Sequence, residues 1–354
     1  MNHEQVTDTA NRAGGSASRE PGRVLITGGA GLIGSALAWE LNREGCDRIV
    51  IADFLGESEK WRNLAPLRFE DYLEADDLFA RLDDGSLGVF DLVLHMGACS
   101  ATTERDSTYL IRNNYEFTKS LCAWSLAHDS RFVYASSAAT YGGGEAGMSD
   151  VVGSLAELER LRPLNAYGYS KQLFDLHAYR TGALDRIVGL KFFNVFGPNE
   201  DHKGEMRSVV RKAYEQVLES GTIRLFRSYR PEYADGEQER DFLYVKDAVR
   251  SVLHLALGMS ASGLYNVGSG RTHTWLELAH AVFQAMELPP VVEFVEMPES
   301  LRAKYQYHTC AELGRLESTG YTQPSTPLNE AVDDYVRNYL ARDRRLGDES
   351  REAT

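Results

Sequence analysis

The run Thr27-Gly28-Gly29-Ala30-Gly31-Leu32-Ile33-Gly34 directly follows the short apolar run Val24-Leu25-Ile26. Its glycines have the spacing GxxGxxG, which permits a tight turn, close approach of the backbone to a pyrophosphate, and tight packing of a helix on a strand. A helical pattern follows, with apolar residues on one face at Leu32, Ile33, Ala36, Leu37 and Leu41. A strand, a glycine loop and a helix in this order predict a dinucleotide-binding unit whose helix N-terminus faces the phosphates.

An acidic residue, Asp53, ends the next predicted strand, residues 48–53. It is placed to accept hydrogen bonds from an adenosine ribose, and a carboxylate there favours NAD over NADP because it repels a 2′-phosphate. Lys60 and Arg62 follow closely and can reverse that preference. The composition of this loop therefore leaves the choice between the two nucleotides open.

Further apolar strands are predicted at residues 92–95, 131–135 and 187–193, with helices between them at 109–127 and 167–179. Buried strands that alternate with helices predict an α/β fold with a Rossmann-type, doubly wound parallel sheet. The pattern changes after Gly197-Pro198, where a basic helix, a polar loop and a strand at 241–245 follow. We expect the nucleotide-binding domain at 23–197 plus about 241–270, and a smaller mixed α/β substrate-binding lobe at about 198–240 plus 271–340.

Both ends of the chain are polar. Residues 1–22 lack the basic start and apolar stretch of a signal peptide and predict a disordered tail, and residues 343–354 predict a charged, frayed C-terminal tail. No stretch approaches the roughly 18 apolar residues of a membrane span. The net charge of −14 argues against a nucleic-acid partner but not against an anionic small ligand.

The four cysteines lie far apart, without the spacing of a zinc or redox site, at Cys46, Cys99, Cys122 and Cys310. They are typical of reduced thiols in a cytosolic protein, and we expect no metal.

A tyrosine and a lysine lie four residues apart in the run Asn165-Ala166-Tyr167-Gly168-Tyr169-Ser170-Lys171. A tyrosine hydroxyl titrates near pH 10 and needs nearby positive charge to act as a base near neutrality. Lys171, one helical turn from Tyr167, can supply that charge together with an oxidised nicotinamide, and can hold the nicotinamide ribose. Ser136 and Ser137 follow the strand ending at Ala135, and we favour Ser137 as the hydroxyl that binds the substrate oxygen.

Together these features resemble the extended short-chain dehydrogenase/reductase family, which consists largely of nucleotide-sugar epimerases, dehydratases and related reductases. The matching segments run from residue 24 to about residue 270 and include TGGAGLIG (27–34), ASSAATYGG (135–143), YGYSK (167–171), FFNVFGP (192–198), RDFLYV (240–245) and YNVGSG (265–270). Three more segments, 97–104, 201–204 and 302–306, narrow the resemblance to the ADP-glyceromanno-heptose 6-epimerases. Those enzymes use a nicotinamide cofactor to invert C6 of an ADP-activated heptose of the lipopolysaccharide core.

The resemblance implies roles for individual residues. Tyr167 and Lys203 are the two acid/base residues, Lys171 supports Tyr167, and Lys60 lies beside a 2′-phosphate, which favours NADP. Besides Gly28, Gly31, Gly34 and Lys171, the implied cofactor contacts are Leu32, Ile33, Asp53, Phe54, Lys60, Met96, Gly97, Ala98, Cys99, Ser100, Asn113, Val195 and Lys203. The implied substrate contacts are Ser137, Asn194, Glu205, Lys212, Phe226, Arg227, Ser228, Tyr229, Arg240 and Tyr305. A cytoplasmic homo-oligomer, a pentamer, is implied as well.

The chain departs from the family pattern at several positions. Met96 replaces a usual Glu, Lys212 a common His and Glu205 a common Ser, and the loop 227–239 is long and acidic. These departures bear on the sugar accepted rather than on the reaction type. Two alternatives remain: another nucleotide-sugar enzyme such as a UDP-glucose 4-epimerase, and a non-catalytic NADP-binding regulator or scaffold. The second class commonly lacks the Tyr or the Lys, and both are present here.

Overall fold

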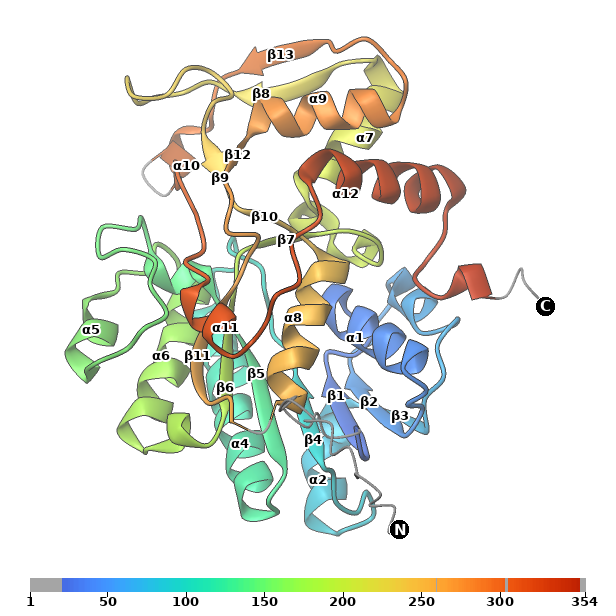
Figure 1. The fold of residues 1–354 in the computed structure, drawn as a ribbon, viewed down its shortest axis with the longest axis vertical. Helices are drawn as coiled ribbons and strands as arrows, with labels where there is room; N and C mark the ends of the chain where they lie inside the picture. The colour runs from blue at the N-terminus through green and yellow to red at the C-terminus, as the bar shows by residue number, and fades with distance from the viewer. Residues whose placement is uncertain (1–20, 259, 303–304, 351–354) are drawn as a thin grey trace, which may run out of the picture.

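A seven-stranded parallel sheet forms the centre of the molecule (Figure 1). The computed structural model describes residues 21–258, 260–302 and 305–350. The strand order is β11-β6-β5-β4-β1-β2-β3, and the strands are β1 Val24–Thr27, β2 Ile49–Asp53, β3 Asp71–Glu74, β4 Leu92–His95, β5 Arg131–Ser137, β6 Val188–Phe192 and β11 Gly263–Val267. The predicted α/β class with a doubly wound parallel sheet is confirmed.

Helices cover both faces of this sheet because successive residues of each strand point to opposite faces. Leu25, Val50 and Val93 belong to one apolar cluster, whereas their neighbours Ile26 and Ile51 belong to the other. The helices of these layers are α1 Leu32–Arg43, α2 Leu78–Asp83, α3 Ser107–Leu110, α4 Phe117–Ala127, α5 Leu155–Arg160, α6 Ala166–Arg180 and α8 Val245–Leu257. A π-helical segment, Ile111–Glu116, joins α3 to α4.

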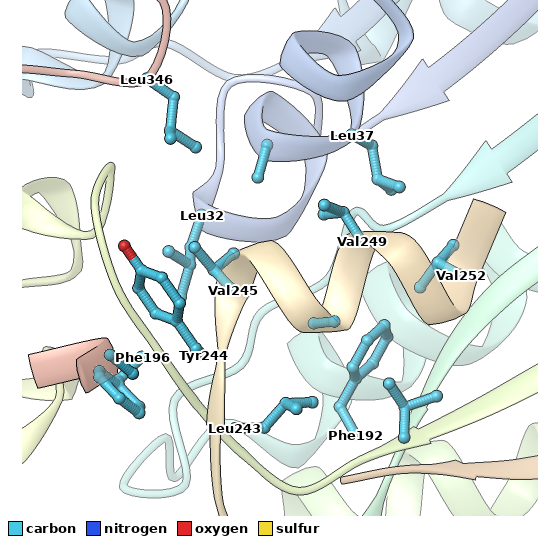
Figure 2. Packing of buried hydrophobic residues seen from close by; sticks show 14 of the residues in the cluster. Leu32, Leu37, Phe192, Phe196, Leu243, Tyr244, Val245, Val249, Val252 and Leu346 are labelled. Carbon is cyan, nitrogen blue, oxygen red and sulfur yellow. The ribbon is translucent and has the colours of Figure 1, made fainter. Parts of the chain in front are cut away.

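Helix α1, which follows the glycine loop, packs against α8. Figure 2 shows Leu37 of α1 facing Val249 of α8, with Leu32 beside Val245 at the start of α8. All four side chains are buried. This contact joins the glycine loop to a segment more than two hundred residues later in the chain, as expected for non-local packing in a doubly wound fold.

A second group of elements lies at one end of the sheet (Figure 1). Two-stranded pairs form there between β8 Ile223–Phe226 and β13 Val292–Val295, between β9 Glu239–Arg240 and β12 His273–Thr274, and between β7 Asn194–Phe196 and β10 Phe242–Tyr244. The helices are α7 Val209–Ser220, α9 Trp275–Ala285, α10 Glu299–Arg302 and α12 Leu328–Asp334, whereas α11 Gly314–Ser318 lies beside the edge strand β11 of the central sheet. Helix α9 begins with a capping box between Thr274 and Glu277, which fixes its first turn.

The two predicted tails have different outcomes. Residues 1–20 of the predicted N-terminal tail lie outside the described residues. The expectation of a frayed C-terminal end is wrong for residues 343–350, because Leu346 is fully buried and Arg345 is 6% exposed. Charge dominates the sequence there, but Leu346 packs into the apolar core, and Asp343 and Arg345 form ion pairs with Arg62 and Asp201. Within the described part of the chain, no helix is long and apolar enough to cross a membrane.

The α1–α8 contact can be tested by truncating a side chain in it. Leu37→Ala should lower the free energy of unfolding by about 2–5 kcal/mol, since it removes buried methyl groups and leaves a cavity. Leu218→Ala, at a position 64% exposed on α7, should change it by less than about 0.5 kcal/mol. Chemical denaturation of both variants measures this, and equal effects would contradict the packing.

Candidate active site

A cavity of about 670 Å³ opens at the carboxyl ends of the central strands. In parallel α/β sheets this edge is where ligands bind. The predicted residues that line it are Gly28, Gly31, Leu32, Ile33, Gly34, Asp53, Phe54, Lys60, Met96, Gly97, Ala98, Cys99, Ser100, Asn113, Ser137, Tyr167, Lys171, Asn194, Val195 and Lys203. The cavity therefore brings together all the predicted cofactor and acid/base residues, although they come from segments far apart in the chain.

The glycine loop forms a cradle that fits a pyrophosphate. Gly28 has a φ of 66°, a value that favours glycine, and a Cβ there would lie 2.6 Å from the backbone of Gly97. A Cβ on Gly34 would lie 2.2 Å from the carbonyl oxygen of Gly28. Only glycine allows this close packing, which places the backbone N–H groups at the start of α1 beside the cavity.

The carboxylate of Asp53 is held by three donors. It accepts hydrogen bonds from the N–H of Ala30 (2.8 Å) and of Phe54 (2.7 Å), and the Lys60 ammonium pairs with it at 2.5 Å. Lys60 lines the cavity, so its charge neutralises Asp53 on the side where a ribose would bind. This arrangement reduces the repulsion of a 2′-phosphate that a lone carboxylate would exert.

Helix α6 presents Tyr167 and Lys171 to the cavity. The helix begins at an Asn165 cap, whose side chain accepts from the N–H of Gly168 at 2.8 Å. Burial raises the pKa of Tyr167, and the neighbouring Ser137 hydroxyl opposes that rise. Burial lowers the pKa of Lys171 to about 8, and the nearby Asp175 carboxylate opposes that fall. Among the protein's own groups burial dominates and keeps Tyr167 protonated near neutrality, and the lowering of its pKa by Lys171 together with an oxidised nicotinamide stays a prediction.

A buried ion pair that the sequence interpretation missed lies behind these residues. Lys191 of β6 pairs with Asp175 of α6 at 2.8 Å, and both side chains are buried. Asp175 also accepts from the hydroxyl groups of Ser136 (2.9 Å) and Tyr134 (2.8 Å). This network ties α6 to the end of β5, where Ser137 lies. A carboxylate four residues after Lys171 was the sequence signal that could have found it.

Lys203 reaches the cavity from a loop rather than from the sheet. It lies in the 3₁₀ segment Asp201–Met206, and its N–H donates to the carbonyl of Glu200 at 3.0 Å. Burial lowers the pKa of Lys203, and the Glu200 carboxylate opposes that fall. The adjacent His202 has a pKa lowered to about 4, mainly by burial, and is neutral near pH 7.

Several predicted substrate residues do not line this cavity: Glu205, Lys212, Phe226, Arg227, Ser228, Tyr229, Arg240 and Tyr305. Glu205 pairs with Lys212 at 3.3 Å, and Arg227 pairs with Asp235 at 2.9 Å. These ion pairs lie in the second group of elements, which forms one side of the site. Sequence position alone did not separate side chains that face the cavity from those that pair with one another.

Arg240 does not line the cavity, but it contacts Trp275, an aromatic residue that does. Its guanidinium lies 5.5 Å from the ring of Trp275, a cavity-lining residue, and 5.0 Å from the ring of Tyr305. The Trp275 indole N–H donates to the Tyr305 hydroxyl at 2.8 Å. No carboxylate among the described residues forms an ion pair with Arg240. Trp275 was absent from the predicted site because no motif marks it.

Comparison with known proteins agrees with this geometry. The sequence model of the NAD dependent epimerase/dehydratase family matches residues 24–268. The chain belongs to this family. It is 52% identical to ADP-L-glycero-D-manno-heptose-6-epimerase of Nitratidesulfovibrio vulgaris over 90% of this chain and 98% of that one. The enzyme of the same name from Pseudomonas aeruginosa is 39% identical over 90% of this chain and 99% of that one.

Solved structures show the same architecture. A crystal structure of Helicobacter pylori ADP-L-glycero-D-manno-heptose-6-epimerase superposes with a TM-score of 0.74 at 27% identity, over 90% of this chain and 96% of that one. Thermus thermophilus UDP-glucose 4-epimerase, solved in complex with NAD, superposes with a TM-score of 0.70 at 25% identity, over 90% and 99% of the two chains. The resemblance drawn from the sequence is confirmed, and the chain is an enzyme of the isomerase class.

The glycine cradle predicts that adding a single methyl group to one of its glycines weakens nucleotide binding. Gly34→Ala should weaken nucleotide binding about tenfold or more, because its Cβ would displace the carbonyl of Gly28. Gly314→Ala, where an added Cβ meets nothing within 4 Å, is the matched control and should bind normally. Calorimetric titration with NADP and NAD measures both variants, and full binding by Gly34→Ala would refute the cradle.

The pKa of Lys171 predicts a pH dependence. Its charge is present below about pH 8 and is lost as the pH rises through that value. Nucleotide affinity should therefore fall between about pH 7 and pH 9 if the ammonium holds the nicotinamide ribose. Lys171→Met should remove that part of the pH dependence, which fluorescence titration at a series of pH values measures. If affinity depends on pH in the same way in the native protein and in Lys171→Met, the ammonium of Lys171 does not hold the nicotinamide ribose.

Proposed function

We propose that this enzyme interconverts ADP-D-glycero-β-D-manno-heptose and ADP-L-glycero-β-D-manno-heptose by transient oxidation at C6. The observation that carries this proposal is the 52% identity, over nearly the whole length of both chains, to a protein that bears that activity in its name. The cavity supports it, because Tyr167 and Lys203 line it together with the glycine cradle. Family likeness also supports a cytoplasmic homo-oligomer.

Inversion at C6 requires a ketone because the C6 hydrogen is not acidic. The glycine loop, Asp53 and Lys60 would hold a nicotinamide dinucleotide, which would supply the hydride acceptor and donor for oxidation and re-reduction at C6. The protein must take a proton from the C6 hydroxyl and later return one to the oxygen. Since the oxygen occupies a different position in each epimer, we assign Tyr167 to one position and Lys203 to the other.

The two groups have properties suited to these roles. Tyr167 is kept protonated by burial, so it can donate to the substrate oxygen, and the positive charge of an oxidised nicotinamide would favour its deprotonation. Burial makes the Lys203 ammonium more acidic, which brings its pKa closer to neutrality. Ser137, the last residue of β5, lies beside Tyr167 and is the candidate partner of the substrate oxygen.

We infer that residues of about 198–240 plus 271–340 form the substrate-binding lobe. Within this lobe, the diphosphate of ADP-heptose is proposed to bind near Arg240. The guanidinium lies beside two aromatic rings, donates to the backbone carbonyls of Glu239 and Gln306, and has no carboxylate partner among the described residues. Arginine is suited to bidentate pairing with a diphosphate. Tyr305 and Trp275 would fix its orientation, and Asn194 lines the same cavity.

A UDP-sugar 4-epimerase is the second candidate, since the superposition on Thermus thermophilus UDP-glucose 4-epimerase covers 90% of this chain. The lower identity, 25% against 52% for the heptose epimerase, disfavours it. Conversion of ADP-D-glycero-D-manno-heptose by purified protein without added cofactor, followed by NMR, tests the proposal. The L-glycero epimer is expected, and conversion of UDP-glucose alone would overturn the assignment.

The two acid/base residues predict matched losses of turnover. Tyr167→Phe and Lys203→Ala should each lower kcat about 10²–10⁴-fold while the thermal unfolding midpoint stays near that of the native protein. Tyr169→Phe, at a 51% exposed tyrosine of the same helix, should retain full turnover. Near-normal turnover by Lys203→Ala would show that the reaction does not use two bases.

We also propose NADP rather than NAD as the resident nucleotide, on the basis of the Lys60–Asp53 pair. Lys60→Ala should lower NADP affinity about tenfold or more and affect NAD much less, because it leaves the Asp53 carboxylate facing the 2′-phosphate. Lys119→Ala, outside the cavity lining, is the control. Mass spectrometry of nucleotide released on denaturation identifies what each protein carries, and equal losses for both nucleotides would contradict the proposal.

A further inference from the structure

The C-terminal residues Asp343–Gly347, here called the C-terminal strap, cross the loop that carries Lys203. The N–H of Leu346 donates to the side-chain oxygen of Asn199 at 3.1 Å. The Arg345 guanidinium pairs with Asp201 at 2.8 Å, and only 7% of the Arg345 side chain is exposed. Leu346 is fully buried and belongs to the apolar cluster of Figure 2. The strap thus contacts two of the four residues that precede Lys203.

Asn199 links this loop to the nucleotide-binding loop. It is buried and has a φ of 77°, so its backbone is fixed in a conformation that non-glycine residues seldom adopt. Its side-chain nitrogen donates to the Ser35 hydroxyl at 3.0 Å, and its carbonyl accepts from Asn63 at 3.0 Å. Asn63 also donates to the carbonyl of Ala30 at 2.9 Å, within the glycine loop. The start of the Lys203 loop is therefore tied to the cofactor cradle.

The strap also contacts the cofactor side of the site. Asp343 pairs at 2.6 Å with Arg62, which lies in the same 3₁₀ helix, Glu59–Asn63, as Lys60. Gly347 lies against Pro66, where an added Cβ would come within 3.1 Å of the proline ring. One short segment thus bridges the helix that carries Lys60 and the loop that carries Lys203.

The Lys203 loop is held on both sides of Lys203. Gly204 has a φ of 52°, and its carbonyl accepts from the backbone N–H (3.2 Å) and from the guanidinium (2.8 Å) of Arg207. On the other side of Lys203, Asp201 is held by Arg345 and by Arg211 of α7, the latter at 2.8 Å. Loss of the Arg345 contact leaves Asp201 with Arg211 as its ion-pair partner among the described residues, and removes one of the contacts that hold the Lys203 loop.

We propose that Arg345 is a positioning residue that holds Lys203 at the substrate oxygen. The inference rests on the proposed acid/base role of Lys203. Glu200 stays anchored independently, through Tyr335 (2.9 Å) and the Ser208 hydroxyl (2.6 Å), so an Arg345 variant keeps its fold. In such a variant the Lys203 ammonium is displaced from the substrate oxygen, which lowers turnover and leaves substrate affinity unchanged.

The first test is kinetic. Arg345→Ala should lower kcat about tenfold with KM for ADP-heptose unchanged, because small misplacements of a catalytic group are costly. Arg345→Lys should recover most of that loss, and Arg342→Ala, at an exposed arginine of the same region, should match the native enzyme. In the Lys203→Ala background, Arg345→Ala should cause no further loss. An undiminished tenfold loss there would overturn the proposal.

The second test does not depend on the reaction. Hydrogen exchange measured by mass spectrometry should be faster at residues 199–206 in Arg345→Ala, and unchanged at 166–171. Arg342→Ala should leave both segments unchanged. Unaltered exchange at 199–206 would show that Arg345 does not restrain the Lys203 loop, whatever the enzyme's substrate. Failure of the native enzyme to convert ADP-heptose, with faster exchange in the variant, would instead reject the proposed function and keep the strap.

Discussion

The contact between the backbones of Gly28 and Gly97, with Gly34 packed beneath the same turn, is the constraint on which the site depends. A Cβ at Gly28 or Gly34 would overlap backbone atoms, so no other residue allows α1 to start this close to the sheet. This approach brings the N-terminus of α1, the end of β4 and the end of β2 to one cavity. The apolar contact of α1 with α8 then holds the arrangement from behind (Figure 2).

The two proposed acid/base residues are supported in different ways. Tyr167 lies on a helix of the central layers and is backed by the buried pair Asp175–Lys191, which also holds the end of β5. Lys203 lies on a loop whose first residues, Asn199 and Asp201, contact the C-terminal strap. Tyr167 therefore lies on a rigid helix and Lys203 on a loop held by contacts from other segments. In the proposed reaction these two residues serve the two positions of the substrate oxygen.

The sequence was sufficient for the parts of the site whose geometry is local. The glycine spacing, Asp53 after its strand, and Tyr167 one turn before Lys171 are each defined within a few residues, and the structure brings them to one cavity. Contacts between distant segments could not be predicted in this way. Arg345 and Leu346 lie in a charged stretch that resembles a frayed end, and their burial depends on Asn199 and Asp201, more than 140 residues earlier. The Trp275–Arg240–Tyr305 stack likewise has no local signal.

In the proposed reaction, the hydride removed from C6 returns to the same carbon on its other face. Substrate carrying deuterium at C6 tests this most directly, with the enzyme's own nucleotide and no added cofactor. The epimerised product is expected to keep its deuterium at C6, with none exchanged with solvent, because the hydride does not leave the site. Loss of the label to water would contradict it, because the reaction would then proceed by removal of a proton from carbon.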